Sequence, residues 1–330
     1  MTRFRAILHA RNMEFIRDRG TLIWNVLLPV LLVFGFAFVF GGGGTEILSV
    51  GYLGDLPTDL EFFGLEQIDF VAYTDTEDAL SKVQRHQIDL LVDARNGAYY
   101  VNETSPEGGI AGRLLTSLHG DLFRQEEVTG EPIRYVDWFV PGVIGMNMMF
   151  SGIFGVGFVI VRYRKNGVLK RIKATPVSPM QFVSAQVASR FFIVVITSIV
   201  VFAGTNLALR FMMRGSYLLL LLHTMLGVAC MISLGLVFAT RIRSEELASG
   251  LINLVTLPML GASGVFFSLE GAPPAVQTIS KAFPLTHFIE GARSIMLDGV
   301  GFAGIAPSMG ILLGFTLLFL SLASVLFRWE

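Results

Sequence analysis

Six long apolar runs alternate with polar segments along the 330 residues of the chain. The runs have 19 to 26 residues and contain no Asp, Glu, Lys or Arg, and crossing about 30 Å of hydrocarbon takes roughly 17–25 helical residues. They are Leu22–Phe40, Trp138–Val161, Phe191–Leu209, Tyr217–Ala239, Leu247–Phe267 and Phe302–Phe327. We expect the third helix to begin earlier, near Phe182, with Arg190 in its first turns. Since the runs lack the period-2 alternation of barrel strands, the pattern predicts a membrane all-α bundle of six transmembrane helices.

The polar segment between the first two runs, residues 41–137, has the pattern of a small mixed α/β domain inserted into this bundle. Gly41–Gly44 predicts a flexible joint, and about 95 residues suffice for one folded domain. We expect strands over Ile47–Leu53, Ile68–Val71, Asp89–Asp93 and Ala98–Val101, and helices over Thr76–Gln87 and Gly109–Glu127. The apolar faces of the two helices are Ala79, Leu80 and Val83, and Ile110, Leu114, Leu118 and Leu122.

The composition and the charge pattern place the chain in a membrane and orient it. Hydrophobic residues make up 53% of the chain and charged residues only 15%, against roughly 25% charged in an ordinary soluble domain. One set of termini and short loops carries 14 Lys and Arg, and the short loops of the opposite side carry four. Because short loops rich in Lys and Arg stay in the cytoplasm, we expect both termini to be cytoplasmic. Residues 41–137 then form an extracytoplasmic domain with 18 acidic and 6 basic side chains.

The N-terminal segment, residues 1–20, predicts a basic amphipathic helix over Phe4–Arg19. Its apolar stripe is Phe4, Ile7, Leu8 and Phe15, and Arg11 and Asn12 interrupt it. Such a helix can lie along the inner membrane surface, where its arginines meet anionic headgroups. The alternative is a basic leader that only sets the topology.

The loop at residues 162–181 predicts a second short basic helix. Val168, Leu169 and Ile172 share one of its faces, and Lys170, Arg171 and Lys173 share the other. Pro176 is expected to end the helix, because the residue before a proline is pushed out of the α region. A basic helix between two spans can anchor in lipid or dock on a soluble partner, and the residues alone favour neither.

The stretch at residues 268–301 is too polar for a plain span, and it predicts two short helices in or on the outer leaflet. After Pro284, one helix face carries Phe288, Ala292, Ile295 and Met296. Glu290 and Arg293 are three residues apart and can pair. These helices can gate a substrate path or simply pack across the ends of the spans.

Several kinds of site are missing from the sequence. It holds no G-x-x-x-x-G-K-[ST] motif and no Cys/His cluster with zinc spacing. His223 lies near the outer end of the fourth run, where a structural hydrogen bond is the expected role, and Cys230 is expected to be a small buried side chain. The span interiors hold no carboxylate or lysine of the kind that proton- or ion-driven carriers use. This disfavours an intramembrane enzyme or an ion-coupled carrier and indicates that a partner supplies the energy.

The order of these parts resembles the permease subunits of type-2 ABC exporters, the kind that exports drugs and lipids, with a large extracytoplasmic domain. The likeness covers nearly the whole chain. Its most specific pieces are Gly167-Val-Leu-Lys-Arg-Ile-Lys-Ala-Thr-Pro-Val-Ser and Gly264-Val-Phe-Phe-Ser-Leu-Glu-Gly-Ala-Pro-Pro, followed by Phe283-Pro-Leu-Thr-His. The resemblance implies a cytoplasmic helix at 1–20, a first span at 21–40, the outer domain at 41–137 and five spans at 138–330. It further implies a coupling loop at 162–181 and an outer helical hairpin at 268–301.

The same resemblance implies partners and site residues. The chain would be a transport subunit without its own ATPase, and ATP and Mg would be bound by a separate ATPase subunit. Two permeases, identical or paralogous, would flank a lateral path in a bacterial plasma (inner) membrane, and a periplasmic adaptor could join them. We expect no catalytic residue, no metal, no cofactor on this chain and no nucleic-acid partner, whereas membrane lipid is a partner. The residues implied are Lys170, Arg171, Ile172, Lys173, Thr175 and Pro176 in the coupling loop, and Pro284, His287, Glu290 and Arg293 in the outer hairpin.

The residues leave two questions open. Ser151 and Gly155 permit close helix contact, either within one subunit or between two. The second candidate function is a membrane sensor or assembly scaffold, whose outer domain would bind a ligand or a partner protein. The transported molecule is expected to be apolar or amphipathic.

Overall fold

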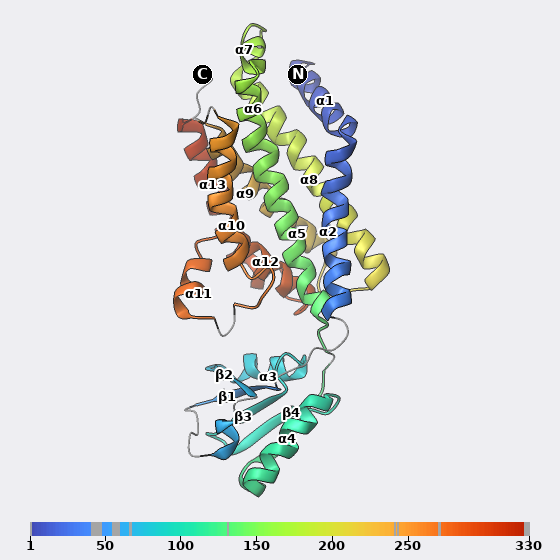
Figure 1. The fold of residues 1–330 in the computed structure, drawn as a ribbon, viewed down its shortest axis with the longest axis vertical. Helices are drawn as coiled ribbons and strands as arrows, with labels where there is room; N and C mark the ends of the chain where they lie inside the picture. Colours follow the sequence, from blue (N-terminus) through green and yellow to red (C-terminus); the bar gives the residue numbers. More distant parts are fainter. Residues whose placement is uncertain are drawn as a thin grey trace. The chain divides into compact units, whose positions relative to one another are not determined.

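The chain divides into two units in a computed structural model that describes residues 2–40, 48–54, 60–65, 68–130, 132–240, 242, 244–269 and 272–326. The first unit, the helical bundle, comprises Met1–Val39 and Val136–Glu330, and the second comprises Phe40–Tyr135. Figure 1 shows the helices of the first unit and the sheet of the second. The expected joint Gly41–Gly44 lies outside the described residues.

The bundle contains five helices, among the residues described, that are long and apolar enough to cross a membrane. The helices of the bundle are α1 (Thr2–Arg17), α2 (Arg19–Phe40), α5 (Tyr135–Ile153), the π-helical turn η3 (Phe154–Phe158), α6 (Val159–Lys165), α7 (Val168–Lys173), α8 (Pro179–Leu209), α9 (Tyr217–Ala239), α10 (Glu245–Ala262), α11 (Pro274–Ser280), α12 (Pro284–Met296) and α13 (Phe302–Leu326). The five apolar helices correspond to α2, α5 continued through η3 and α6, α8, α9 and α13. The chain is therefore an integral membrane protein of helical type.

The segment predicted as the fifth span is the helix α10, which is not among these five helices. It has 18 residues and ends at Ala262, five residues before the predicted end at Phe267. An α-helix of this length is about 27 Å long, slightly less than the roughly 30 Å of a hydrocarbon core. The polar stretch after it does contain the two short helices that the sequence predicts, α11 and α12.

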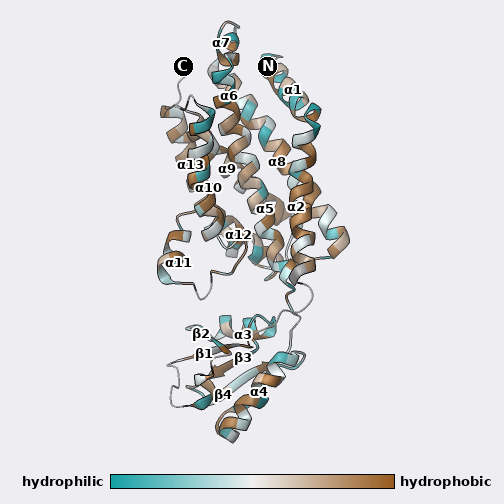
Figure 2. Ribbon diagram, in the orientation of Figure 1, coloured by the Kyte–Doolittle hydropathy of each residue, from teal (hydrophilic) through white to brown (hydrophobic). Residues whose placement is uncertain are grey.

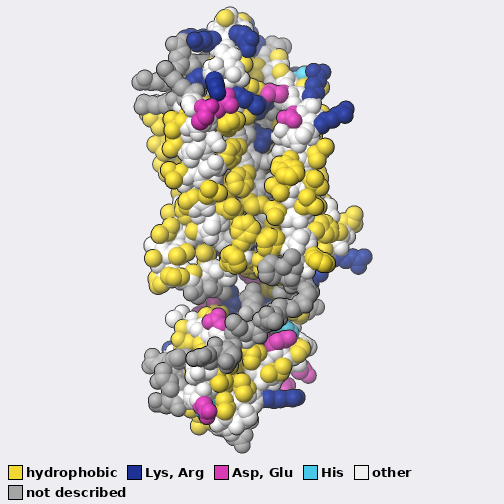
Figure 3. All heavy atoms as spheres, viewed as in Figure 1, with side chains coloured by type: hydrophobic (Ala, Val, Ile, Leu, Met, Phe, Trp, Pro, Cys, Tyr) yellow, Lys and Arg dark blue, Asp and Glu magenta, His cyan; other side chains and the backbone are white. Residues whose placement is uncertain are grey.

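The two ends of the bundle differ in the side chains that they carry. Apolar side chains dominate the middle of the long helices, and polar ones gather on α1 and α7 (Figure 2). Lys and Arg side chains cluster where α1 and α7 lie, at one end of the bundle (Figure 3). We call this end the basic end and the opposite end, where α12 packs, the far end. Large exposed apolar side chains such as Trp24, Leu31 and Ile196 lie between them, as expected for a surface in contact with lipid.

The N-terminal helix α1 ends two residues before the predicted limit. Asp18 separates it from α2 and accepts hydrogen bonds from the Thr21 backbone and hydroxyl, in the manner of a helix cap. These hydrogen bonds hold the pKa of Asp18 below its ordinary value. Arg11 and Asn12, which interrupt the apolar stripe of this helix, are half-buried and face α6 and α8.

The second unit is built on a five-stranded sheet of order β2-β1-β3-β4-β5, in which only the β3–β4 pair is antiparallel. Its elements are β1 (Leu48–Leu53), the 3-10 turn η1 (Glu61–Gly64), β2 (Ile68–Tyr73), α3 (Thr76–Gln84), β3 (Leu90–Asp93), β4 (Ala98–Asn102), α4 (Pro106–His119), the 3-10 turn η2 (Gly120–Leu122) and β5 (Arg124–Val128). Leu90 faces the core under α4 and Leu91 faces the core under α3. The alternation of a strand thus gives the sheet one helix on each side.

The predicted helix Gly109–Glu127 is wrong in its second half and only partly right in its buried face, since Leu114 and Leu118 of the expected stripe do pack against the core. Helix α4 ends at His119, because Gly120 has a positive φ of 59°, and residues 124–128 form β5 instead. Ile110 and Leu122 from the expected stripe are 60% and 58% exposed, whereas Ala111 is buried. The other predicted helix, Thr76–Gln87, ends at Gln84, and its face with Ala79 and Val83 is buried as expected.

Candidate functional site

The basic loop predicted to couple to a partner folds as the short helix α7. Leu169 is 2% exposed and holds the helix to the bundle, while Val168 and Ile172 are half-buried. The remaining coupling-loop residues, Lys170, Arg171, Lys173, Thr175 and Pro176, are exposed. The helix ends at Lys173, and the Thr175 hydroxyl donates to the Ile172 carbonyl in the turn that follows. Lys170 and Arg171 have no ion-pair partner among the described residues, so both charges face outward.

Two side chains of α6, just before α7, tie this helix to its neighbours. The Arg164 guanidinium donates to the carbonyls of Ile242 at 2.5 Å, Ala239 at 3.0 Å and Thr240 at 3.4 Å, where α9 ends. A cation at a helix C-terminus meets the last, otherwise unpaired carbonyls. Lys165 lies 3.7 Å from Glu245 and 3.5 Å from Glu246, in the first turn of α10. These contacts connect α6, which directly precedes α7, to the end of α9 and the start of α10.

Helix α1 is joined to the same region by polar contacts. Arg3 donates to the carbonyl of Pro176 at 2.5 Å, and the Ser189 hydroxyl donates to Asn12 at 2.5 Å. Arg11 donates to the Tyr163 hydroxyl at 2.9 Å. We expected the arginines of this helix to meet lipid headgroups. Arg11 instead directs its charge toward α6.

Glu14 is the acidic centre of this contact. It accepts from Arg11 at 2.8 Å and from the Tyr163 hydroxyl, and Arg162 lies 3.7 Å away. Burial acts to raise the pKa of Glu14, but the hydrogen bonds from Tyr163 and Arg11 and the charges of Arg11 and Arg162 outweigh it. The pKa of Glu14 is therefore below the ordinary value for a glutamate, and the carboxylate is charged at neutral pH.

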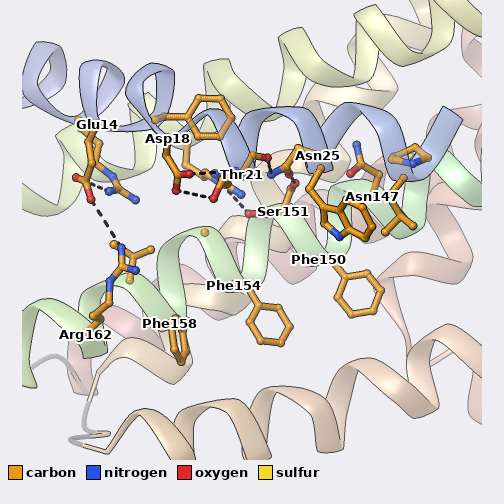
Figure 4. A pocket seen from close by; sticks show the side chains of 18 of the residues that line it. Glu14, Asp18, Thr21, Asn25, Asn147, Phe150, Ser151, Phe154, Phe158 and Arg162 are labelled. Carbon is orange, nitrogen blue, oxygen red and sulfur yellow. Dashed lines mark hydrogen bonds and ion pairs between the residues drawn. The ribbon is translucent and has the colours of Figure 1, made fainter. Parts of the chain in front are cut away.

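A cavity of about 570 Å³ opens beside this contact, between α1, α2, the α5–η3–α6 helix and α8. Figure 4 shows Asp18, at the junction of α1 and α2, followed by Thr21 and Asn25 on α2, with Ser151 opposite Asn25. The Ser151 hydroxyl donates to Asn25 at 2.5 Å. The rings of Phe150, Phe154 and Phe158 project in a row from one side of the α5–η3–α6 helix (Figure 4). The lining is thus amphipathic, with polar and aromatic sides.

Arg190 of α8 also lines this cavity. The sequence predicted its position in the first turns of a span but not its surroundings. Its residue is 8% exposed. Its Nε donates to the Ser151 carbonyl at 2.6 Å, directly before the π-helical turn, and its guanidinium lies 5.7 Å from the Phe15 ring. The guanidinium fits only because residue 155 is glycine, since a Cβ at Gly155 would lie 1.8 Å from Arg190 Nε. The small residues Ser151 and Gly155 therefore serve a contact within one subunit.

At the far end, α12 is anchored by the residues predicted for the outer hairpin. Pro284 is buried in its first turn, and His287 shares a hydrogen bond of 2.8 Å with the Lys281 carbonyl. The predicted ion pair between Glu290 and Arg293 does not form: Glu290 is exposed. The carbonyls of Trp138 and Gly264 accept from Arg293 at 3.1 and 2.7 Å, and its guanidinium lies 3.5 Å from the Trp138 ring. Arg293 therefore joins α12 to the start of α5 and the end of α10.

The remaining candidates behave as structural groups. His223 is fully buried, stacks on the Phe288 ring at 5.2 Å and shares a hydrogen bond of 2.9 Å with the Phe288 carbonyl, which confirms the structural role expected for it. Cys230 is buried, as expected. No group of three or more His, Cys, Asp or Glu side chains that could hold a metal occurs among the described residues.

Sequence comparison adds relatives to this geometry. A family model described as ABC-2 family transporter protein matches residues 19–325. Inner membrane transport permease YhhJ of Escherichia coli (strain K12) is 28% identical over 199 residues, which cover 58% of this chain and 52% of that protein. Probable multidrug ABC transporter permease YbhS of the same strain is 22% identical over 364 residues, covering 98% of this chain and 94% of that protein. Linearmycin resistance permease protein LnrN of Bacillus subtilis (strain 168) is 24% identical over 173 residues, covering 52% and 45%. The chain thus spans about half the length of YhhJ and nearly all of YbhS.

Proposed function

Because the chain belongs to the ABC-2 family of transporter proteins, we propose that it is the permease subunit of an exporter whose ATP is hydrolysed by a separate subunit. The chain itself is a transport component whose sequence holds no P-loop. The exporter would carry an apolar or amphipathic molecule out of the cytoplasm or the inner leaflet. The names of YbhS and LnrN, which refer to multidrug transport and to linearmycin resistance, support an exported substrate.

The exposed basic face of α7 is the observation that carries this proposal. It is the surface on which we place the ATPase subunit, because Lys170 and Arg171 face outward while Leu169 fixes the helix to the bundle. The contacts of Arg164 and Lys165 with α9 and α10 then supply a mechanical route from that surface into the bundle. A partner with an acidic groove would complement this face.

The proposed topology has six spans, with α10 as the fifth in order along the chain. Arg164 fixes the end of α9, and Lys165 fixes the start of α10, at the basic end. Arg293 binds the Gly264 carbonyl, just after α10, at the far end. These contacts support an α10 that runs from one end of the bundle to the other, and an even number of crossings would return both termini to one side. The excess of Lys and Arg there supports a cytoplasmic basic end.

The remaining parts of the proposal concern the assembly. Two permeases would pair in a bacterial plasma (inner) membrane, with Phe40–Tyr135 outside as the unit that an adaptor could contact. The name of YhhJ, an inner membrane transport permease, supports a location in the inner membrane. Crosslinking in native membranes should give a permease dimer, and monomers alone would contradict the pairing.

The proposal is tested by co-expressing the chain with the ATPase encoded beside it. Lys170→Glu/Arg171→Glu should abolish co-purification of the ATPase and its stimulation by the permease. The matched control is Arg5→Glu/Arg17→Glu, which reverses two exposed charges on α1 at the same end. Co-purification and ATPase activity that survive in the α7 variant would contradict the docking surface. An ATPase that binds neither variant nor the unaltered chain would contradict the proposed function.

A further inference from the structure

The cavity beside α1 and α2 contains one positive charge that no carboxylate of the described residues balances. Three arginines line it, and two of them, Arg11 and Arg162, lie near Glu14. The other carboxylate, Asp18, caps α2. The third arginine, Arg190, has one hydrogen bond, from Nε to the Ser151 carbonyl, and no carboxylate partner in the described part of the chain. Holding an unpaired buried charge costs several kcal/mol, so this cation calls for an anion.

The lining of the cavity indicates what kind of anion fits. Asp18 lies just before the span α2, whereas Leu28 and Met146 lie two to three turns deeper. Aromatic side chains, Trp24, Phe150 and Phe154 among them, also line the cavity, and Trp24 is 59% exposed. A charged group at the mouth would therefore continue into an apolar body beside these rings.

A second side chain of the lining is left without a partner. The Asn147 amide nitrogen is buried and forms no hydrogen bond, although buried polar groups in native proteins nearly always have one. Asn147 lies one helical turn from Ser151, whose carbonyl binds Arg190. An acceptor oxygen next to an anionic head, such as an ester carbonyl, would satisfy it.

We propose that this cavity binds the anionic head of a membrane amphiphile, a phosphate or a carboxylate, against Arg190, with the apolar chains along Trp24 and the phenyl row. A guanidinium presents two parallel N–H donors that match either oxyanion. If the bound amphiphile is the exported substrate, the inference rests on the function proposed above and names its substrate class. Binding of the amphiphile to the cavity is a property of this chain alone.

The experiment measures lipid binding to the purified full-length chain, without any ATPase, by native mass spectrometry. Phosphatidylglycerol is compared with phosphatidylcholine of the same acyl chains, and inorganic phosphate is the soluble-anion arm. We expect phosphatidylglycerol to bind at least about tenfold more tightly than phosphatidylcholine, since hydrogen bonds to charged groups are strong. Arg190→Gln should remove this preference and Arg190→Lys should keep part of it. The control Arg17→Gln removes an exposed charge outside the cavity and should change binding less than about twofold.

A second variant serves if Arg190→Gln does not fold. Asn147→Asp has nearly the same shape and places a carboxylate in the lining, so it should also weaken phosphatidylglycerol binding about tenfold. Phosphatidylglycerol binding that is unchanged in both variants, or equal to phosphatidylcholine binding in the unaltered chain, would overturn the proposal. Inorganic phosphate that displaces phosphatidylglycerol at equal concentration would show a site for a free anion and overturn the amphiphile. None of these results depends on ATPase docking, so the two proposals fail separately.

Discussion

At the basic end of the bundle the helices meet through long charged side chains, whereas at the far end they meet through buried aliphatic and aromatic groups. Arg11, Glu14, Tyr163 and Lys165 make their contacts in partly exposed positions. At the far end, most residues of α12 are buried, and His223 and Phe288 stack at the centre of the packing. Exposed ion pairs contribute about 0–1 kcal/mol each, so the basic end can rearrange at small cost while the far end keeps its packing.

The difference fits the proposed function. A surface that responds to ATP hydrolysis has to exchange contacts, and the basic end offers contacts that exchange readily. The far end keeps a fixed shape, because its helices are closely packed. Single substitutions at each end test this difference in packing.

The largest effect is expected at the far end for Phe288→Ala. The side chain is 1% exposed, and removing a buried phenyl ring leaves a cavity that costs about 3–5 kcal/mol. Chemical denaturation in detergent measures the change. Phe302→Ala, which shortens a side chain that is 65% exposed, is the matched control and should cost less than about 1 kcal/mol. Equal losses in the two variants would show that the far end is not the tightly packed region.

The next effect is expected for Gly155→Ala, in the middle of the bundle. The added Cβ would displace the Arg190 guanidinium, and overpacking of this kind costs about 1–3 kcal/mol. Gly204→Ala on α8, whose Cβ would meet nothing within 4 Å, should instead be neutral or stabilise by up to about 1 kcal/mol. Only Gly155→Ala should therefore lower the free energy of unfolding, and a loss of the same size in both variants would contradict the contact.

A smaller effect is expected for Arg164→Met, at the basic end. It removes three hydrogen bonds to carbonyls at the end of α9 and should cost about 1–2 kcal/mol. Lys165→Met, which removes only ion pairs at 3.5 and 3.7 Å, should cost less than about 1 kcal/mol. In the assembled transporter the Arg164→Met variant should still bind the ATPase but stimulate its ATP hydrolysis less. Normal stimulation of ATP hydrolysis would contradict the proposed mechanical route from α7 through α6.

The smallest effect is expected for Glu14→Gln and depends on pH. Because the pKa of Glu14 is lowered in the folded protein, its charge adds stability above the unfolded pKa of about 4.3. This contribution is lost as the pH falls through the folded pKa. The melting temperature of the variant should therefore lie slightly below that of the unaltered chain at pH 7 and approach it only when the pH falls below the lowered pKa of Glu14 in the folded protein. A difference that grows on acidification would contradict the assigned direction.

Periodicity predicted the faces of the short helices well. The apolar side of α12 is buried and that of α7 is partly buried, as the sequence indicated, because a helix that packs on one side repeats every 3.6 residues. The same reasoning was only partly right for residues 109–127. Leu114 and Leu118 pack against the core as indicated, but the small residues Ala111 and Gly112 are buried and the larger Ile110 is exposed. The size of a side chain did not report its burial there, since the helix approaches the strands closely.

The cavity could not be read from the sequence. Its walls come from α1, α2, α5, η3, α6 and α8, and the contact between Arg190 and Ser151 joins residues that are 39 positions apart. The sequence showed only Arg190, in the apolar stretch that begins near Phe182. That pattern indicates a buried charge, but it does not reveal that Gly155 makes room for the guanidinium or that the Ser151 carbonyl binds it.

The most direct test of the account is a crosslink from α7 to the ATPase subunit. The sequence contains one cysteine, Cys230, which is buried, so a cysteine at an exposed position is the reactive one. Lys170→Cys should crosslink to the co-expressed ATPase through a short bifunctional reagent, and Arg113→Cys, on α4 of the second unit, should not. Absence of the Lys170→Cys crosslink in a complex that still forms, or an equal yield from Arg113→Cys, would contradict the assignment of α7 as the docking surface.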